Sequence, residues 1–284
     1  MAGTLYVVAT PIGHLGDLTL RSIETLRAVQ RVVAEDTRRT RALLAHIGVE
    51  KKPLTSLEAH ATARDIDRVV GWLVEGEDVA LVTDAGVPAV SDPGSALVRA
   101  AIEARVRVVP IPGPSAVTAA VAASGIVLGG FRFYGFLPRS GSARADALAS
   151  ILSSPESIVL FESPQRVAAT IDELAELCPD RELVVAREMT KVHEEFVRGT
   201  VASVAAEPRE WLGEVTLVLG PDSGAGGGAN VDDAQVDARI EKELARDPSA
   251  KTVAQRVAAW SGRPRREIYE RVVAMKTAKT SAPT

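Results

Sequence analysis

Residues 79–94 read VALVTDAGVPAVSDPG, an apolar run that leads into a loop rich in Asp, Gly and Pro. Four consecutive apolar residues before such a loop are typical of a strand buried on both faces of a parallel sheet. Similar runs alternate with helical patterns in the first half of the chain; the runs are LYVVA (5–9), RVVAE (31–35) and VRVVP (106–110), and the patterns cover 18–29, 37–47, 62–75 and 93–104. This alternation predicts an α/β domain with a mainly parallel sheet.

A second, strand-richer set of patterns follows Gly113. A helical pattern over 114–124 precedes candidate strands at 131–136, 157–162, 183–188, 195–199 and 214–220. The sequence IPGP (111–114) places two prolines around a glycine, which marks a break between structural segments. We therefore predict an N-terminal α/β domain over residues 1–112 and a second α/β domain, with a mixed sheet, over 113–220.

The C-terminal part has a different composition. PDSGAGGGAN (221–230) predicts a Gly-rich linker that lacks the strand-to-helix context of a dinucleotide fingerprint. Residues 231–284 have helical patterns, with a turn at Ser261 and Gly262 and with Pro264 at a first helical position. Two helices across a tight turn predict a small all-α tail of helix-turn-helix type.

Charge and cysteine content restrict the class of protein. The net charge is −4, whereas residues 251–284 contain eight Lys or Arg and two Glu, so any nucleic acid would have to meet a local basic patch. A single cysteine, Cys178, excludes an internal disulfide and suits a reducing cytoplasm. The start MAGTLYVVATPIG has no basic leader, and the weakly polar stretch 116–130 is too short to span a bilayer. We expect a cytoplasmic protein without a membrane segment.

Several common catalytic motifs are missing from the sequence. It has no G-x-x-x-x-G-K-[ST] loop, no H-E-x-x-H and no G-x-S-x-G, which argues against the common ATPase, zinc hydrolase and esterase classes. The four histidines are scattered without ligand spacing, so we predict no metal site.

Ligands of open α/β sheets bind beyond the carboxyl ends of the strands. The four loops expected there are ATPIGHLGDLT (9–19), AEDTRRTR (34–41), TDAGVPAVSDPG (83–94) and PIPGPSA (110–116). The economical interpretation is one cleft lined by all four loops.

Parts of these loops also have a purely structural interpretation. Asp92 and Pro93 are a typical N-cap and first residue of a helix. By contrast, the small residues after Asp84 allow backbone amides and carbonyls to approach a ligand closely. Ser115 at a helix start fits either a buried N-cap or a helix terminus that binds a carboxylate.

The loop after 31–35 concentrates charge. Glu35 and Asp36 lie at the end of a strand, where charges seldom serve packing, although acidic residues near the positive end of a helix also stabilise it. Arg38 and Arg41 lie three residues apart on one helix face and can bind phosphates.

These loops resemble those of a known family. The matching segments, in order, are TPIGHLGDLTLR (10–21), AEDTRRT (34–40), DAGVPAVSDPG (84–94), PGPSAVTAA (112–120), FYGFLPR (133–139), FESPQR (161–166) and AREMTKVHEEFVRG (186–199). With them the chain resembles the 16S ribosomal RNA cytidine 2′-O-methyltransferases, a branch of the tetrapyrrole methylase superfamily that uses S-adenosylmethionine (SAM).

The resemblance implies two α/β domains with SAM in the cleft between them, a homodimer, and a helical C-terminal domain. It implies methylation of the ribose 2′-oxygen of a decoding-site cytidine in 16S RNA on the 30S ribosomal subunit. By position it assigns SAM contacts to Pro11, Asp84, Ala85, Gly86, Val87, Ser115, Ala116, Phe161, Met189, Val215 and Thr216.

The chain departs from the family pattern at three places. His14 stands where Asn is common, and Leu212 stands where Lys is familiar before the last strand. In LEAHA (57–61), Glu58 and Ala61 replace His and Asn, which places a catalytic role for that segment in doubt.

Methyl transfer from a sulfonium needs no covalent enzyme intermediate, but a ribose hydroxyl benefits from a nearby proton acceptor. Our candidates for that acceptor are Glu35, Asp36 and His60. The candidates for RNA binding are Arg38, Arg41, Arg139 and Lys191, together with Arg263, Arg265 and Arg266 at the start of the last helix. Any of these residues is alternatively a solvated surface charge.

Two other functions compete with this one. A SAM-dependent tetrapyrrole C-methyltransferase would have a similar cofactor site, but the sequence has TPIGHLGD in place of that branch's Gly-rich first loop and carries a basic tail. A nonenzymatic RNA-binding ribosome-assembly factor would not need acidic residues at the strand ends.

Overall fold

The computed structural model describes residues 2–57, 61–90, 94–221, 233–261 and 263–280. Its contacts divide the chain into two compact units, one of Met1–Ala123 with Arg187–Glu195 and one of Ser124–Ala186 with Phe196–Thr284. From the sequence we predict a domain boundary after residue 112 and a separate domain formed by the tail. In the structure, most of helix α5 (Ala116–Ser124) and the segment Arg187–Glu195 belong to the first unit.

The first unit contains a five-stranded sheet in the order β3-β2-β4-β1-β5. Its strands are β1 (Thr4–Val8), β2 (Arg31–Ala34), β3 (Leu54–Ser56), β4 (Val79–Val82) and β5 (Arg107–Ile111), and the pairs β1–β4, β1–β5, β2–β3 and β2–β4 are all parallel. The predicted parallel sheet is confirmed. Strand β3 is additional, because LTS is too short and too polar to give an apolar run.

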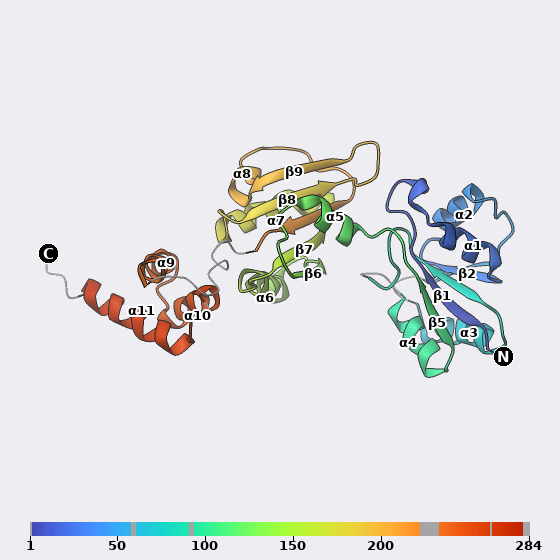
Figure 1. Cartoon of the computed structure of the whole chain (residues 1–284), viewed down its shortest axis with the longest axis horizontal. Coiled ribbons are helices and arrows are strands. Elements are labelled where there is room, and N and C mark those ends of the chain that lie inside the picture. The colour runs from blue at the N-terminus through green and yellow to red at the C-terminus, as the bar shows by residue number, and fades with distance from the viewer. Residues whose placement is uncertain (1, 58–60, 91–93, 222–232, 262, 281–284) are drawn as a thin grey trace. The chain divides into compact units, whose positions relative to one another are not determined.

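Helices cover both faces of this sheet. They are α1 (Leu20–Ala28), α2 (Thr37–His46), α3 (Ala63–Val74) and α4 (Ser95–Glu103), with a short 3₁₀ helix η1 (Leu15–Asp17) before α1. Leu26 of α1 and Leu44 of α2 pack with Val32 on one face, whereas Leu73 of α3 and Leu97 of α4 pack with Val33 and Leu81 on the other. Figure 1 shows these two pairs of helices on opposite sides of β1 and β2.

The second unit contains a five-stranded sheet in the order β6-β7-β10-β8-β9. The strands are β6 (Phe131–Phe136), β7 (Ser157–Glu162), β8 (Glu182–Arg187), β9 (Glu195–Thr200) and β10 (Val215–Leu219). Because β6 pairs with β7 in parallel and β10 pairs with β7 antiparallel, the predicted mixed sheet is confirmed. Helices α6 (Gly141–Leu152), α7 (Pro164–Leu177) and α8 (Val201–Ala205) contribute to one hydrophobic core with the strands.

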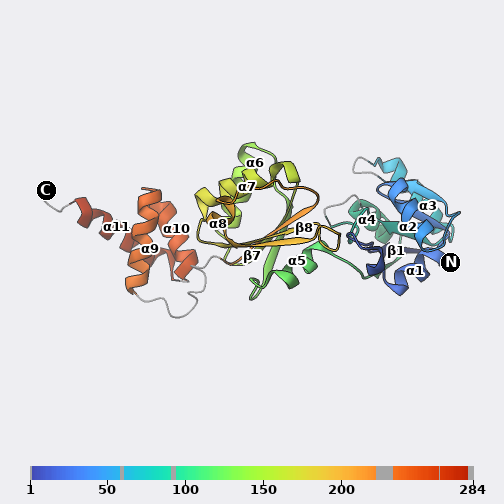
Figure 2. The same cartoon turned by 90° about the horizontal axis from the view of Figure 1, so that it is seen from above.

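The C-terminal part is helical, as predicted, but it has three helices in its described residues: α9 (Asp233–Arg246), α10 (Ala250–Ser261) and α11 (Arg265–Thr280), visible in Figure 2. Val236, Ile240, Val257, Ile268 and Val272 form their fully buried core. Ser261, predicted in a turn, is the last residue of α10, and Pro264, predicted at a first helical position, immediately precedes α11. Gly262 lies outside the described residues. Most of the predicted linker and the proposed cap at Asp92 and Pro93 fall outside the described residues.

No helix within the described ranges is both long enough and apolar enough to cross a membrane.

Candidate functional site

The loops after β1 and β4 are joined to each other in the first unit. The backbone of Thr10 exchanges two hydrogen bonds with that of Gly86, at 2.9 and 3.0 Å, and the Thr10 hydroxyl donates to the carbonyl of Thr83 at 3.1 Å. Pro11, the next residue, is buried. Two of the loops that the sequence assigns to a ligand therefore form one rigid edge.

Gly86 has a local structural role. Its φ of 82° lies in the left-handed region, which glycine adopts without strain, and both its N–H and its carbonyl are bonded to Thr10. These bonds join the two loops, and the role of Gly86 in ligand binding stays a prediction. Asp84, Ala85 and Val87, the predicted residues on either side of Gly86, are half-buried and therefore remain accessible.

Acidic side chains meet where β2 and β4 end. The carboxylate of Asp84 accepts a hydrogen bond from the backbone N–H of Asp36 at 3.1 Å, and the Arg39 guanidinium lies 3.5 Å from it. Glu35 accepts a hydrogen bond from the Thr83 hydroxyl at 2.9 Å. Burial, together with the nearby negative charge of Glu35, raises the pKa of Asp84. The loop edge therefore concentrates negative charge, which favours a cationic group on a ligand.

Asp36 is the N-cap of α2. Its carboxylate accepts hydrogen bonds from the Arg38 backbone N–H at 2.8 Å and from the Arg38 guanidinium at 2.9 and 3.2 Å. These bonds to Arg38 lower the pKa of Asp36 to about 2. A carboxylate of such low basicity is a weak proton acceptor, so Glu35 is the better candidate of the two. His60, the third candidate, lies outside the described residues.

The segment Arg187–Glu195 contacts the first loop. The Thr190 hydroxyl accepts a hydrogen bond from the His14 backbone N–H at 3.0 Å. A Cβ at Gly13 would lie 2.5 Å from Cγ of Lys191 and 2.7 Å from the Thr190 hydroxyl. Local sequence patterns distinguish neither Gly13 nor Thr190, because the hydrogen bond joins His14 to a residue 176 positions further along the chain.

The segment Arg187–Glu195 has an unusual backbone conformation. Glu188 and Thr190 have positive φ values of 49° and 66°, which are uncommon for residues with a side chain. Lys191, a predicted phosphate contact, forms an ion pair with Glu188 at 2.8 Å, and Met189, a predicted SAM contact, is only 8% exposed.

His14 has a structural explanation. Its Nδ1 atom accepts a hydrogen bond from the Gly16 backbone N–H at 3.0 Å and so caps η1. An asparagine at this position would offer a similar acceptor for capping.

Helix α5 begins at Ala116, directly after the half-buried Ser115. The first backbone N–H groups of a helix have no partner within it, and the helix dipole gives this end partial positive charge. Both predicted residues therefore lie where an anionic group of a ligand is favoured.

The remaining predicted SAM contacts lie in the second unit. Phe161 of β7 is directly opposite Thr216 of β10 and also packs against Phe136, with ring centroids 5.6 Å apart. Val215 points to the other face because side chains alternate along a strand, and there it belongs to the hydrophobic core. Val215 is therefore buried, and its assignment as a SAM contact stays a prediction.

The predicted RNA contacts differ in exposure. Arg38 is 88% exposed but paired with Asp36; Arg41 and Arg139 are exposed. In the tail, Arg263 is paired internally, whereas Arg265 and Arg266 are exposed. Over the described part of the chain, no group of three or more His, Cys, Asp or Glu is arranged to hold a metal ion.

Comparison with known sequences places the chain among methylases. Residues 4–205 match the family described as Tetrapyrrole (Corrin/Porphyrin) Methylases. A relative from Xylella fastidiosa, named ribosomal RNA small subunit methyltransferase I, is 40% identical over 94% of this chain and 98% of its own length. Relatives of the same name from Bacillus subtilis and Thermotoga maritima are 36% and 46% identical over 94% and 76% of this chain, and over 93% and 98% of their own lengths.

Solved structures share the fold at much lower identity. Uroporphyrin-III C-methyltransferase from Thermus thermophilus, complexed with S-adenyl homocysteine, matches with a TM-score of 0.56 and 17% identity over 77% of this chain and 97% of its own. A diphthine synthase matches with a TM-score of 0.60 and 17% identity, over 77% of this chain and 90% of its own.

Proposed function

The chain belongs to the tetrapyrrole methylase family, in the group of ribosomal RNA small subunit methyltransferases I, and on this premise we propose that it transfers a methyl group from SAM to the ribose 2′-oxygen of a cytidine in 16S ribosomal RNA. The observation that carries the proposal is the identity of 36 to 46% with relatives of that name, which are matched over nearly their whole lengths. The tetrapyrrole enzymes resemble the chain at under 20% identity, which supports the fold and not their substrate.

The described loops fit SAM as the methyl donor. The half-buried carboxylate of Asp84 suits the ammonium group of the amino-acid moiety, and the start of α5 at Ser115 and Ala116 suits its carboxylate. We assign further contacts to Pro11 and Met189 in the first unit and to Phe161 and Thr216 in the second. When bound, SAM supplies a methyl group on a positively charged sulfur.

The residues of the chain then have two tasks. The loops fix the 2′-oxygen opposite the leaving sulfur, which accounts for most of the rate enhancement expected of an in-line displacement. Glu35 accepts the hydroxyl proton as the new bond between carbon and oxygen forms, while the bond between carbon and sulfur breaks. Thr83, which donates to Glu35, orients the carboxylate.

We further propose that the substrate is the assembled 30S subunit, at a decoding-site cytidine, and that the enzyme acts as a cytoplasmic homodimer. Arg38, Arg41, Arg139 and Lys191 are the proposed phosphate contacts near the reaction. Sedimentation of the purified chain tests the dimer, because a monomer and a dimer of 30.0 kDa chains are readily resolved.

One experiment tests the reaction. The chain is incubated with methyl-labelled SAM and, separately, with 30S subunits, naked 16S RNA and a tetrapyrrole precursor. We expect label in the 30S RNA at one cytidine, with the adjacent phosphodiester resistant to alkali because a methylated 2′-oxygen cannot attack it. Label on a nucleobase or on the tetrapyrrole would overturn the proposal. Binding of RNA and SAM without transfer would favour the assembly-factor function.

A further inference from the structure

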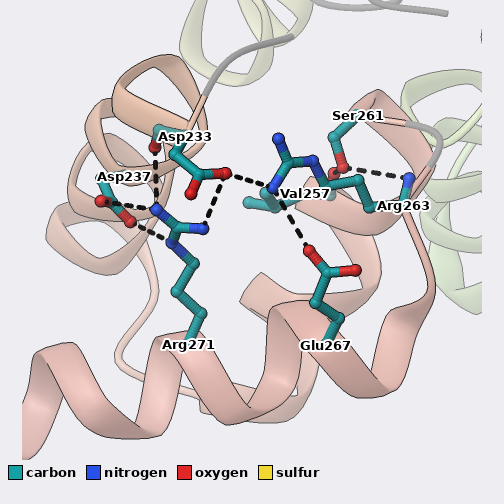
Figure 3. A network of polar contacts seen from close by, with 7 residues as sticks. All are labelled: Asp233, Asp237, Val257, Ser261, Arg263, Glu267 and Arg271. Atoms are coloured by element: carbon teal, nitrogen blue, oxygen red, sulfur yellow. Dashed lines mark hydrogen bonds and ion pairs between the residues drawn. The ribbon is translucent and has the colours of Figure 1, made fainter. Parts of the chain in front are cut away.

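The arginines of the helical tail fall into two groups. Arg271 forms hydrogen bonds with both carboxylate oxygens of Asp237, at 2.6 and 3.0 Å, and lies 3.1 Å from the carboxylate of Asp233. Arg263 pairs with the same Asp233 at 2.6 Å and with Glu267 at 3.2 Å. Figure 3 shows that both guanidinium groups point toward α9. These arginines connect α9 to α11 and to the turn before it.

A third acidic residue of α9, Glu243, neutralises more of the positive charge. Glu243 is 3% exposed and pairs with Arg239 at 3.1 Å and with Arg256 at 3.4 Å. The basic excess that the sequence shows after residue 251 is therefore partly cancelled by α9. The surface that can attract an anion is smaller than the sequence suggests.

Three cations outside these networks gather around an exposed tyrosine. Lys251, Arg265, Arg266 and Tyr269 line a shallow depression of about 520 Å³. Tyr269 is 45% exposed, and Arg266 has an exposed side chain whose ion pair with Glu270 spans 3.1 Å. Such exposed pairs contribute little to stability and are easily exchanged. Lys251 and Arg265 form no ion pair with any described residue.

The position of these cations is unfavourable for the isolated helices. Lys251 lies in the first turn of α10, and Arg265 and Arg266 begin α11, so all three oppose the positive end of a helix dipole. Arg265 and Tyr269 are four residues apart and share one face of α11. Packing does not explain why the exposed Tyr269 ring lies beside three cations that oppose helix dipoles. Binding of a polyanion that carries aromatic rings, such as a nucleic acid, does explain it.

We propose that this surface, the Tyr269 patch, binds a single-stranded or looped segment of RNA, with one base stacked on Tyr269 and the flanking phosphates held by Lys251, Arg265 and Arg266. The identification of RNA rests on the proposed function. A single strand is preferred because the bases of a duplex are already stacked and are not available to an aromatic side chain.

The test uses the full chain and a labelled RNA of about 12 nucleotides, a length within the range that such surfaces cover, both single-stranded and annealed to its complement. Tyr269→Ala should weaken single-strand binding by about 5- to 150-fold without changing the salt dependence, and Tyr269→Phe should retain affinity. Arg265→Ala with Arg266→Ala should reduce the slope of log affinity against log salt by about 1.4. The matched control, Arg64→Ala with Arg99→Ala, removes two exposed charges of the first unit and should leave both quantities unchanged.

The outcomes separate this proposal from the proposed function. Circular dichroism first verifies that each variant keeps its helices, and methyl transfer by the unaltered chain is measured in parallel. If transfer to 30S RNA occurs but the tail variants bind RNA like the unaltered chain, the Tyr269 patch is not an RNA site and is left for a protein partner. If Tyr269→Ala and Tyr269→Phe have the same affinity for single-stranded RNA, the proposal that a base stacks on Tyr269 is wrong. If the variants lose RNA binding while no methyl is transferred to any RNA, the proposed function fails and the patch stands.

Discussion

The backbone N–H of Asp36 donates a hydrogen bond of 3.1 Å to the carboxylate of Asp84, so the end of β2 is fixed to the end of β4 by a charged side chain. The same carboxylate is held at a raised pKa by burial and by the charge of Glu35. Asp84 thus both joins two of the proposed SAM loops and supplies negative charge to them.

Asp84→Asn should separate binding from stability. The amide oxygen can still accept from Asp36, but the negative charge is lost, so we expect SAM affinity to fall at least about tenfold. The pKa of Asp84 is raised in the folded state, so ionising this carboxyl lowers the unfolding free energy. This loss of stability is absent at acid pH and develops as the pH rises through the raised pKa. The variant lacks this penalty and should therefore melt at pH 7 at a temperature no lower than that of the unaltered chain, measured calorimetrically. Unchanged SAM affinity would remove Asp84 from the site.

Asp36→Ala should destabilise the chain mainly through α2. It removes the N-cap and the anchor of Arg38, and we expect the melting temperature to fall by about 2 to 4 °C. Asp36→Asn keeps an acceptor and is the control. The stability contributed by ionised Asp36 is present above its ordinary pKa of 3.8 and is lost as the pH falls through about 2. Thermal melts from pH 2 to 5 should therefore converge for Asp36→Asn and the unaltered chain at the acid end.

Gly86→Ala tests the rigid edge between the loops after β1 and β4. A Cβ would meet Ile12 at an ordinary 3.6 Å, so the cost comes from the φ of 82° and not from a clash. We expect a loss of about 1 to 2 kcal/mol in unfolding free energy together with weaker SAM binding. Gly48 has a φ of 76° and no described atom within 4 Å of an added Cβ, so Gly48→Ala imposes similar strain away from the loops. Equal SAM affinities of the two variants would contradict this assignment.

Gly13→Ala should displace the segment that carries Thr190 and Met189. The added Cβ would lie 3.0 Å from the Met189 carbonyl and closer still to Thr190 and Lys191. We expect reduced methyl transfer, with a larger effect than that of Thr190→Val, which removes only the acceptor for His14. The control Gly71→Ala has open space inside α3 and should raise the unfolding free energy by about 0.5 to 1 kcal/mol without affecting transfer.

Arg271→Ala should open the tail, whereas Arg266→Ala should not. Removing Arg271 leaves Asp237 without the guanidinium that lowers the pKa of its carboxyl, whereas Asp233 keeps its ion pair with Arg263. Limited proteolysis should then cut within residues 233–280 far faster than in the unaltered chain, because the ion pairs of Arg271 with two aspartates of α9 are lost. Equal protection of the two variants would show that the hydrophobic core alone holds the three helices.

The sequence by itself determined the architecture. Apolar runs such as VALV and their flanking loops specify buried parallel strands through local periodicity, and the order of the motifs identifies the family. It also indicated which strand ends carry Glu35, Asp36 and Asp84, because parallel strands share their carboxyl edge.

Only the tertiary structure decided what the individual side chains do. Asp36 is tied to Arg38 and Asp84, Thr190 meets His14 across 176 positions, and Arg263 points to Asp233 while Arg266 remains exposed. The periodicity of a sequence encodes which face of an element is buried. The partner of a charged side chain depends on distances between segments far apart in the chain, and these distances exist only in the folded protein.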